Sequence, residues 1–260
     1  MEKTNNSKKS LYLSSLRMAI ATMMSRVLGL VREQIIAAYF GANQWTDAYL
    51  LAYRIPNLFR DLLAEGSFSV AFVPEFIESI KKSQESARKL FWSNFLFLFI
   101  VTSVLSLLMI IFSKELITLF ISKKYLVSTE FVDAAQIMLI TMAFYLVFVS
   151  LAALCMGALN AKRVFFLPAM GAVLFNLILI VTMLLFPKIL VSWGYRSIYA
   201  LSIGVLLAGI GQFLLQIPKV IQLGFKPTLK FNIFHSSNIK ILKALGAGFV
   251  GFASVQINIL

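Results

Sequence analysis

The sequence predicts an all-α integral membrane protein: a helical bundle of six membrane spans plus a partial seventh. Hydrophobic residues make up 60% of the 260 residues and charged residues only 13%, and the mean hydropathy is +0.86. Soluble chains average about 45–50% apolar and about 25% charged residues. The composition therefore excludes a soluble enzyme and a disordered chain. A single cysteine, Cys155, excludes an intrachain disulfide scaffold.

Four apolar runs are long enough to cross a bilayer, which requires about 20 mostly apolar residues. In the last of them, three glycines would let a neighbouring helix approach closely. These glycines are Gly204, Gly209 and Gly211. The four predicted spans are Phe91–Phe112, Ala134–Leu159, Val164–Phe186 and Ile198–Leu223.

Two earlier segments, Leu11–Phe40 and Thr46–Ile80, carry several charges, and Pro56 interrupts the second. We expect both to span, because polar residues are tolerated inside a membrane bundle where they face a cavity. Ala244–Leu260 is the start of a further apolar run. The predicted organisation is a six-helix transmembrane lobe at 1–223, a basic cytoplasmic link at 224–243, and the start of a seventh helix at 244–260.

The basic residues indicate the orientation. The net charge of +13 is read as topology-setting loop charge rather than as a nucleic-acid-binding surface, because cytoplasmic loops are enriched in lysine and arginine. The less basic set of helix ends holds Lys114, Lys123, Lys124, Lys188 and Arg196. The more basic set holds Lys3, Lys8, Lys9, Arg17, Lys81, Lys82, Arg88, Lys89, Lys162, Arg163, Lys219, Lys226, Lys230, Lys240 and Lys243. We therefore expect a multi-pass protein whose N-terminus is cytoplasmic.

Four arginines fall inside the first two predicted spans: Arg26, Arg32, Arg54 and Arg60. Each costs about 2.5–3.5 kcal/mol at a helix centre on insertion scales. Such residues need carboxylate partners, a water-filled cavity or an anionic ligand. Arginine suits phosphate, because its planar fork stays charged and binds phosphate oxygens in a bidentate manner.

Acidic residues accompany these arginines. Asp47, Arg54 and Asp61 recur every seven residues and Glu65 follows four later, so they share one face of a regular helix. Pro56 should bend that stripe, because it removes a backbone hydrogen bond.

On the first helix, Arg26 and Glu33 are also seven residues apart. Arg32 is offset from Arg26 by about 120° on a regular helix, unless the helix bends near Gly29. Two interpretations follow. The arginines line a cavity for an anionic headgroup, or they form a structural ion-pair network with Glu33, Asp47, Asp61 and Glu65.

Sequence motifs for other chemistry are lacking. There is no glycine-rich phosphate loop, no H-E-x-x-H motif and no nucleophile elbow. The lone histidine, His235, has no partner at metal-ligand spacing. We expect no catalytic residue, no metal and no cofactor.

At these same charged segments the chain resembles the MurJ (MviN) family of lipid II flippases. Later and looser matches include Gln212 and the stretch Gln216-Ile217-Pro218. The resemblance covers nearly all of this chain but only about half of a family member. The resemblance rests on five sequence segments: S-R-V-L-G-L-V-R-E at 25–33, F-G-A at 40–42, T-D-A at 46–48, I-P-N-L-F-R at 55–60 and A-E-G-S-F-S-V-A-F-V-P at 64–74.

The resemblance implies the N-terminal lobe of the multidrug/oligosaccharidyl-lipid/polysaccharide exporter fold, with the C-terminal lobe missing from this chain. It implies a transporter that flips lipid II, the lipid-linked peptidoglycan precursor, from the cytoplasmic to the outer leaflet of the bacterial inner membrane by alternating access, for cell wall synthesis. Its partners would be lipid II, the phospholipid bilayer and the C-terminal lobe, without nucleic acid.

The resemblance also assigns roles to residues. Arg26, Arg32 and Arg60 match family arginines thought to engage the substrate diphosphate. Arg54 matches a basic position, and Asp47 and Glu65 match acidic ones. Two departures are Glu33 in place of the more usual aspartate, and Asp61 where a second basic residue is common. We expect Asp61 to pair with Arg54.

Two alternatives remain open at this stage. The chain could export another lipid-linked saccharide or a drug, although drug export would not need four basic residues converging on a diphosphate. It could also be a non-transporting membrane scaffold or a truncated half-protein.

Overall fold

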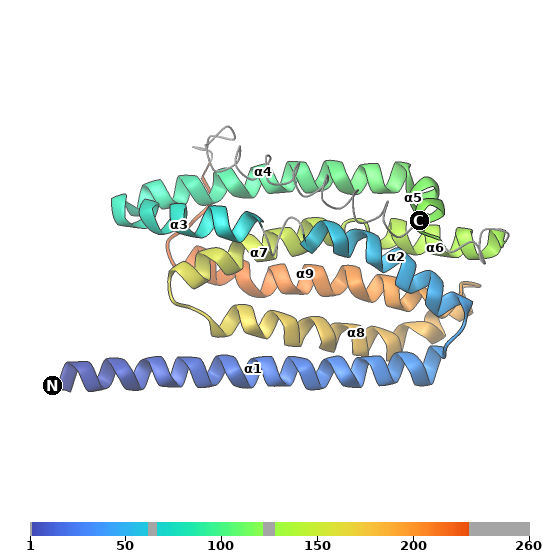
Figure 1. Ribbon diagram of the computed structural model, residues 1–260, viewed down its shortest axis with the longest axis horizontal. Helices are drawn as coiled ribbons and strands as arrows, with labels where there is room; N and C mark the ends of the chain where they lie inside the picture. The colour runs from blue at the N-terminus through green and yellow to red at the C-terminus, as the bar shows by residue number, and fades with distance from the viewer. Residues whose placement is uncertain (1, 62–66, 122–127, 229–260) are drawn as a thin grey trace, which may run out of the picture.

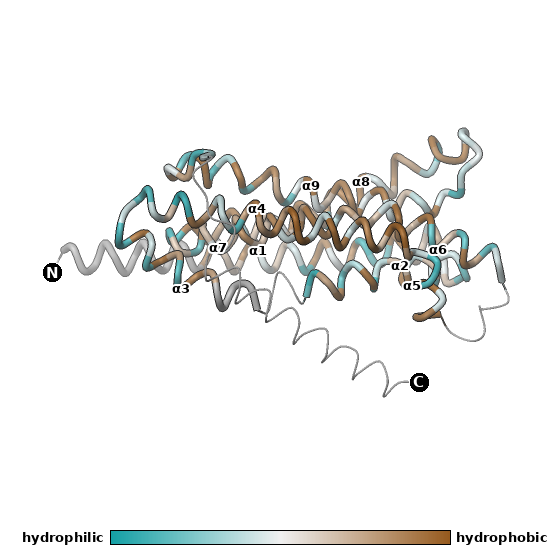
Figure 2. Tube along the Cα trace, turned by 90° about the horizontal axis from the view of Figure 1, so that it is seen from above, coloured by the Kyte–Doolittle hydropathy of each residue, from teal (hydrophilic) through white to brown (hydrophobic). Residues whose placement is uncertain are grey.

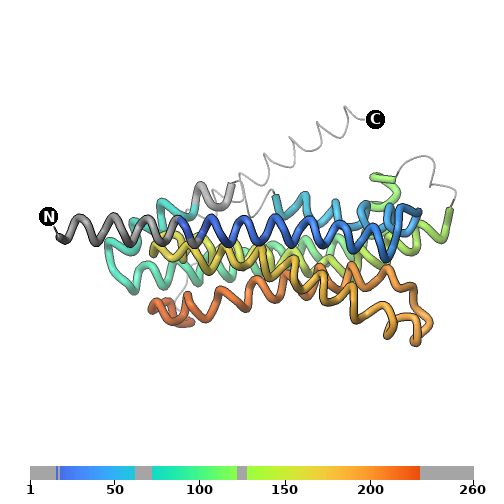
Figure 3. The backbone as a smooth tube through the Cα atoms, turned by 90° about the horizontal axis from the view of Figure 1, so that it is seen from below, coloured from blue at the N-terminus to red at the C-terminus, as the bar shows by residue number. Residues whose placement is uncertain are grey.

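The computed structural model describes residues 2–61, 67–121 and 128–228. Figures 1 and 3 show, from two directions, helices lying side by side along a common axis. In the described residues the helices are α1 (Glu2–Phe40), α2 (Gln44–Arg60), α3 (Ser67–Lys82), α4 (Gln84–Ile111), α5 (Ser113–Phe120), α6 (Thr129–Met142), α7 (Tyr145–Ala161), α8 (Phe166–Ser192) and α9 (Tyr199–Gln222).

Short polar side chains start several of these helices. The Asn43 side chain accepts hydrogen bonds from the backbone N–H groups of Trp45 and Thr46, at 2.9 and 3.3 Å. Ser83 and Ser128 cap α4 and α6 in the same way. A capping side chain satisfies a backbone donor that the first helical turn leaves unpaired. These caps fix where the chain reverses direction between helices.

Helix α7 forms the centre of the bundle. Nearly all its residues are buried, and it packs against α4 and α9. Helix α8 packs on α9, and α1 packs on α8 at the edge of the bundle (Figure 1). Helix α2 crosses to pack on α6 and α7. The fold thus encloses a space between α1, α2, α7, α8 and α9.

Four stretches in the described part of the chain are long and apolar enough to cross a membrane: Gln84–Ile111, Thr129–Ala161, Phe166–Ser192 and Tyr199–Gln222. They coincide with the four clear spans that the sequence predicts. Figure 2 shows their hydrophobic residues along the middle of the bundle and hydrophilic residues toward its ends. The charged segments that contain α1, α2 and α3 are not in this set, so their crossing stays a prediction.

The structure corrects the expected boundaries at two places. Thr46–Ile80 does not form one helix bent at Pro56: α2 continues through Pro56 to Arg60, and α3 begins at Ser67. The run Ala134–Leu159 is divided between α6 and α7, with a turn at Ala143 and Phe144. The short helix α5, which follows the predicted span Phe91–Phe112, is not indicated by the sequence.

The predicted link at 224–243 and the predicted seventh helix at 244–260 lie mostly outside the described residues. The first residues of the link pack back onto the bundle. Phe225 is fully buried against Phe76 and Phe91. The indole N–H of Trp92 donates a hydrogen bond to the Phe225 carbonyl at 3.1 Å. The chain therefore leaves α9 in a fixed direction at this end of the molecule.

The more basic helix ends lie together. The α3–α4 turn, the α7–α8 connection and the end of α9 are at the same end of the bundle (Figure 1). They carry Lys81, Lys82, Lys162, Arg163 and Lys219. This clustering agrees with the charge asymmetry found in the sequence, and the side of the membrane on which this end lies stays a prediction.

The glycines of α9 permit the close packing that the sequence indicates. A methyl group at Gly204 would lie 2.3 Å from Thr182 Oγ1 and 2.9 Å from Leu179 Cδ2 on α8. At Gly209 it would lie 2.6 Å from the Tyr145 ring on α7. Both approaches are shorter than real contacts allow, so α7 and α8 reach α9 only where it lacks side chains.

We predict that Gly204→Ala destabilises the bundle by about 1–3 kcal/mol, the usual cost of overpacking a filled core. Thr182 cannot readily yield, because its hydroxyl donates to the Ile178 and Leu179 carbonyls. Thermal unfolding in detergent would measure the loss. Gly29→Ala is the matched control, since its added methyl group would meet nothing closer than 3.9 Å. Equal stability of the two variants would refute tight α8–α9 packing.

Candidate functional site

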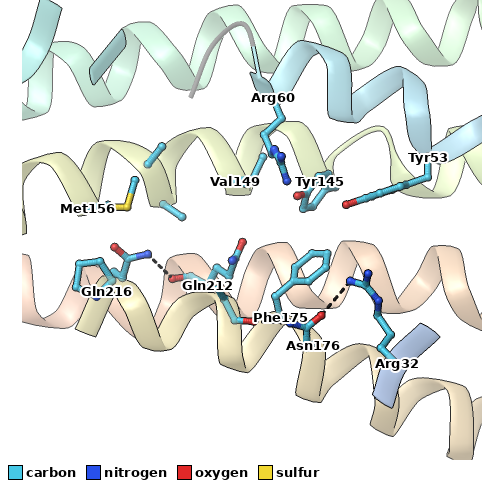
Figure 4. Close-up of a pocket in the computed structure, with 14 residues that line it drawn as sticks. Arg32, Tyr53, Arg60, Tyr145, Val149, Met156, Phe175, Asn176, Gln212 and Gln216 are labelled. Atoms are coloured by element: carbon cyan, nitrogen blue, oxygen red, sulfur yellow. Dashed lines mark hydrogen bonds between the residues drawn. The ribbon is translucent and has the colours of Figure 1, made fainter. Parts of the chain in front are cut away.

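The five helices around the centre enclose a cavity of about 340 Å³. Figure 4 shows that charged and polar groups enter it from opposite walls. Its volume is at the small end of the range of about 300–1,000 Å³ found for ligand pockets. The lining residues are Arg32, Tyr53, Arg60, Tyr145, Val149, Ala152, Ala153, Met156, Pro168, Ala172, Phe175, Asn176, Gln212 and Gln216.

Arg32 of α1 is held at one end of this cavity by Asn176 of α8. The Arg32 Nη1 group donates a hydrogen bond to Asn176 Oδ1 at 2.9 Å. The Asn176 amide nitrogen donates to the carbonyls of Ser25 and Ala172, each at 3.1 Å. This amide therefore joins α1 to α8 and fixes the guanidinium, while Arg32 also forms an ion pair with Glu33.

Arg60 enters the cavity from the last turn of α2. Its Nη2 atom forms an ion pair with Asp61 at 2.8 Å. The position is favourable for a cation, because the carbonyl end of a helix carries partial negative charge. In Figure 4 the guanidinium points toward the phenol of Tyr145, beside Tyr53. Two tyrosines thus lie between Arg60 and the Arg32 end of the cavity.

A second cavity, of about 290 Å³, adjoins the first. Arg32, Tyr53 and Phe175 line both of them. Asp47 and Glu33 line only the second. Arg32 therefore lies where the two spaces meet, with acidic side chains on one side and the phenols and amides on the other.

The structure brings two of the four sequence-predicted arginines together. Arg32 and Arg60 line the first cavity, whereas Arg26 and Arg54 are exposed and outside its lining. Helix α1 runs from Glu2 to Phe40 without a break at Gly29 (Figure 1). On an unbroken helix Arg26 and Arg32 point in directions about 120° apart, which explains why only one of them reaches the cavity.

The predicted acids are placed as follows. Glu33 and Asp61 pair with the arginines next to them in the sequence. For Asp61 the observed partner is Arg60, in place of the expected Arg54. Glu65 lies outside the described residues. In the part of the chain that the structure describes, no group of three or more His, Cys, Asp or Glu side chains could hold a metal ion.

Three polar lining residues are not singled out by the sequence: Tyr53, Tyr145 and Asn176. Asn176 is only 6% exposed and interrupts the apolar run of α8, and a buried amide needs hydrogen-bond partners. That interruption was the available signal. The sequence gives no such signal for the two tyrosines, because aromatic residues are also common at lipid-facing and interfacial positions of membrane proteins.

The comparisons with known proteins agree on one family. The family model for lipid II flippase MurJ matches residues 36–260. A probable lipid II flippase MurJ of Buchnera aphidicola subsp. Schizaphis graminum (strain Sg) is 32% identical over 249 residues, which are 95% of this chain and 47% of that protein. The lipid II flippase MurJ of Burkholderia cenocepacia (strain J2315) is 35% identical over 86% of this chain and 42% of its own length.

A solved structure, of lipid II flippase MurJ in an inward closed conformation, superposes with a TM-score of 0.72. It is 29% identical in sequence, and the match covers 93% of this chain and 48% of that one. The chain thus spans about half the length of the curated relatives that it matches.

We predict that Arg32 and Asn176 are energetically coupled. Hydrogen bonds to charged groups contribute about 1.5–3 kcal/mol. The single variants Arg32→Met and Asn176→Leu, measured with the double variant by unfolding in mixed micelles, should therefore give a coupling free energy in this range. Arg32→Met combined with Gln136→Leu is the control, because Gln136 bonds Ser113 elsewhere in the bundle. If the changes in unfolding free energy of Arg32→Met and Asn176→Leu simply add in the double variant, Asn176 does not hold the guanidinium.

Proposed function

Because this chain belongs to the MurJ family of lipid II flippases, we propose that it binds the diphosphate of lipid II in the Arg32–Arg60 cavity. The chain would supply the N-terminal lobe of the flippase. The second lobe would complete the path along which the headgroup crosses the membrane. The activity proposed is transport rather than enzyme chemistry.

The observation that carries the proposal is the convergence of two arginines on one cavity within an apolar bundle. Arg32 reaches it from α1 and Arg60 from α2. A guanidinium among membrane-spanning helices is costly unless it is paired or hydrated. A diphosphate offers several oxygens and two or more negative charges, so two guanidinium groups can each bind it in a bidentate manner.

The exposure of the acids favours the headgroup-binding interpretation over a structural ion-pair network. The side chain of Glu33 is 60% exposed and that of Asp61 is 49% exposed, whereas those of Arg32 and Arg60 are 25% and 24% exposed. Pairs with solvated carboxylates contribute only about 0–1 kcal/mol. A bound phosphate could therefore replace either carboxylate at small cost, and each acid would return to water.

The route follows from the charge asymmetry of the helix ends. We propose that the lysine-rich end of the bundle faces the cytoplasm. Lipid II would pass its polar headgroup through the cavity, from the cytoplasmic to the outer leaflet of the inner membrane, while its polyprenyl tail stays in lipid. Alternating access would rock this lobe against the second one, as in other transporters with a central site.

The roles of the remaining charged residues are proposed from the family resemblance. Arg26 and Arg54 would contact phosphate in another conformation, since both are exposed in this one. Asp47 lines the cavity that adjoins Arg32 and would moderate the positive potential there. The role of Glu65 rests on its sequence match.

We predict that Arg32→Ala and Arg60→Ala each weaken the binding of lipid II about 10- to 100-fold. The loss of a charge-assisted hydrogen bond is worth about 1.5–3 kcal/mol, and every 1.4 kcal/mol is tenfold in affinity. Native mass spectrometry of the detergent-solubilised protein would report the retained lipid. The control is Lys188→Ala, which removes one positive charge from an exposed position on α8.

Retention unchanged in both arginine variants would count against the diphosphate site. Retention of apolar drugs in place of lipid II by the unaltered protein would instead favour a drug exporter. Binding without any transfer in a flippase complementation test would favour a lipid-binding scaffold.

A further inference from the structure

The end of the cavity away from the arginines is built from two glutamine side chains of α9. In Figure 4, Gln212 and Gln216 lie at the opposite end from Arg32. Gln216 is 4% exposed and lines the cavity. This end therefore presents neutral amides where the other end presents cations.

The orientation of the Gln216 amide follows from its hydrogen bond. Its nitrogen, Nε2, donates to the Gln212 backbone carbonyl at 3.3 Å, and a carbonyl can only accept. The Gln212 amide nitrogen in turn donates to the Gly171 carbonyl of α8 at 3.2 Å. Each of these nitrogens uses one of its two N–H groups on a backbone carbonyl. The Gln216 amide is thereby oriented with its oxygen turned away from the Gln212 carbonyl.

That oxygen, Oε1, is buried and has no hydrogen-bond partner among the residues that the structure describes. A buried acceptor without a donor costs free energy, and such groups call for an explanation. The described part of the protein thus provides no donor for Gln216 Oε1. A ligand that carries an N–H group into the cavity would provide one.

The residues around Gln216 indicate which chemical group should adjoin the N–H donor of a ligand. Met156 of α7 lies beside Gln216 in Figure 4, and Ala152, Ala153 and Pro168 also line the cavity. They are apolar and mostly small, so they suit a short alkyl group next to the polar contact. An acylamino group combines an N–H donor with an adjoining apolar carbon.

We propose that the Gln216 end of the cavity is an amide-recognition subsite, in which Gln216 Oε1 accepts the N–H of an acylamino group of the headgroup. This inference rests on the proposed function, because Arg32 and Arg60 must hold the diphosphate for the amide to be positioned. The same chemistry could come from the acetamido group of a sugar or from a peptide amide. The experiment distinguishes these two sources.

The test measures binding to the complete protein, expressed from its own gene and purified in detergent, with undecaprenyl diphosphate lipids that differ in one group. The first pair carries N-acetylglucosamine or 2-deoxyglucose, so only one member has the amide. The second pair carries N-acetylmuramic acid with or without its peptide. We expect the unaltered protein to prefer the amide-bearing member of one pair roughly three- to tenfold, the range for a single neutral hydrogen bond.

Gln216→Met should abolish that preference, with the affinity of each variant for plain undecaprenyl diphosphate measured as its own reference. Gln216→Glu, which keeps the side-chain length and an acceptor oxygen, should retain the preference even if overall affinity falls. Gln222→Met is the control, because Gln222 is an exposed residue of the same helix. Thermal unfolding of all the variants verifies that they are folded.

A preference within the first pair assigns the amide to the sugar, and a preference only within the second assigns it to the peptide. Equal binding within both pairs, or a preference that survives Gln216→Met, overturns the subsite and leaves the diphosphate proposal standing. No binding of any undecaprenyl diphosphate by the unaltered protein overturns the proposed function and the subsite together.

Discussion

A guanidinium group placed among apolar helices must be satisfied by the protein around it, and the arrangement of the edge of this bundle depends on that requirement. The Asn176 amide meets it for Arg32. The same amide donates to the carbonyls of Ser25 on α1 and Ala172 on α8. The contact that fixes the cation therefore also fixes helix α1, which otherwise packs only at the edge of the bundle. One side chain thus both orients the Arg32 guanidinium and joins α1 to α8.

The central packing makes room for this polar cluster. Helix α9 lies close to α7 and α8 only because Gly204 and Gly209 lack side chains, and the tight contact brings Gln212 and Gln216 against the backbone of α8. Tyr145, pressed against Gly209, points its phenol toward Arg60 (Figure 4). The glycines thus position cavity residues on two different helices, although none of these glycines lines the cavity.

The sequence predicts the apolar helices well and the charged segments less well, for a physical reason. Hydropathy identifies α4, α8 and α9, because burial in lipid requires a long apolar run. It cannot locate the turn between α6 and α7, since both sides of the turn are equally apolar. In Thr46–Ile80 the proline predicts an interruption, yet α2 continues through Pro56.

The site was predictable to the extent that helical periodicity applies. The charges of Arg32 and Arg60 identified them, and the angular offset of Arg32 from Arg26 holds on the unbroken helix α1. Asn176 and Tyr145 were missed because their roles depend on which helices become neighbours. Gln216 was noted only as a family match, since nothing in the sequence shows that its oxygen would be buried without a donor.

The two ends of the cavity differ chemically, with neutral amides toward one end of the bundle and cations toward the other. Gln216 is near the end of α9, at the lysine-rich end of the molecule, whereas Arg32 is near the opposite end, where α1 finishes (Figures 1 and 4). Attraction between a diphosphate and two guanidinium groups acts over several ångströms, while a hydrogen bond to a neutral amide acts only at contact. Under the proposed function, a headgroup entering from the lysine-rich end would be drawn inward by charge before it could contact Gln216. In such an arrangement the cations would supply most of the affinity, and the neutral amide would discriminate only among headgroups that the cations already hold.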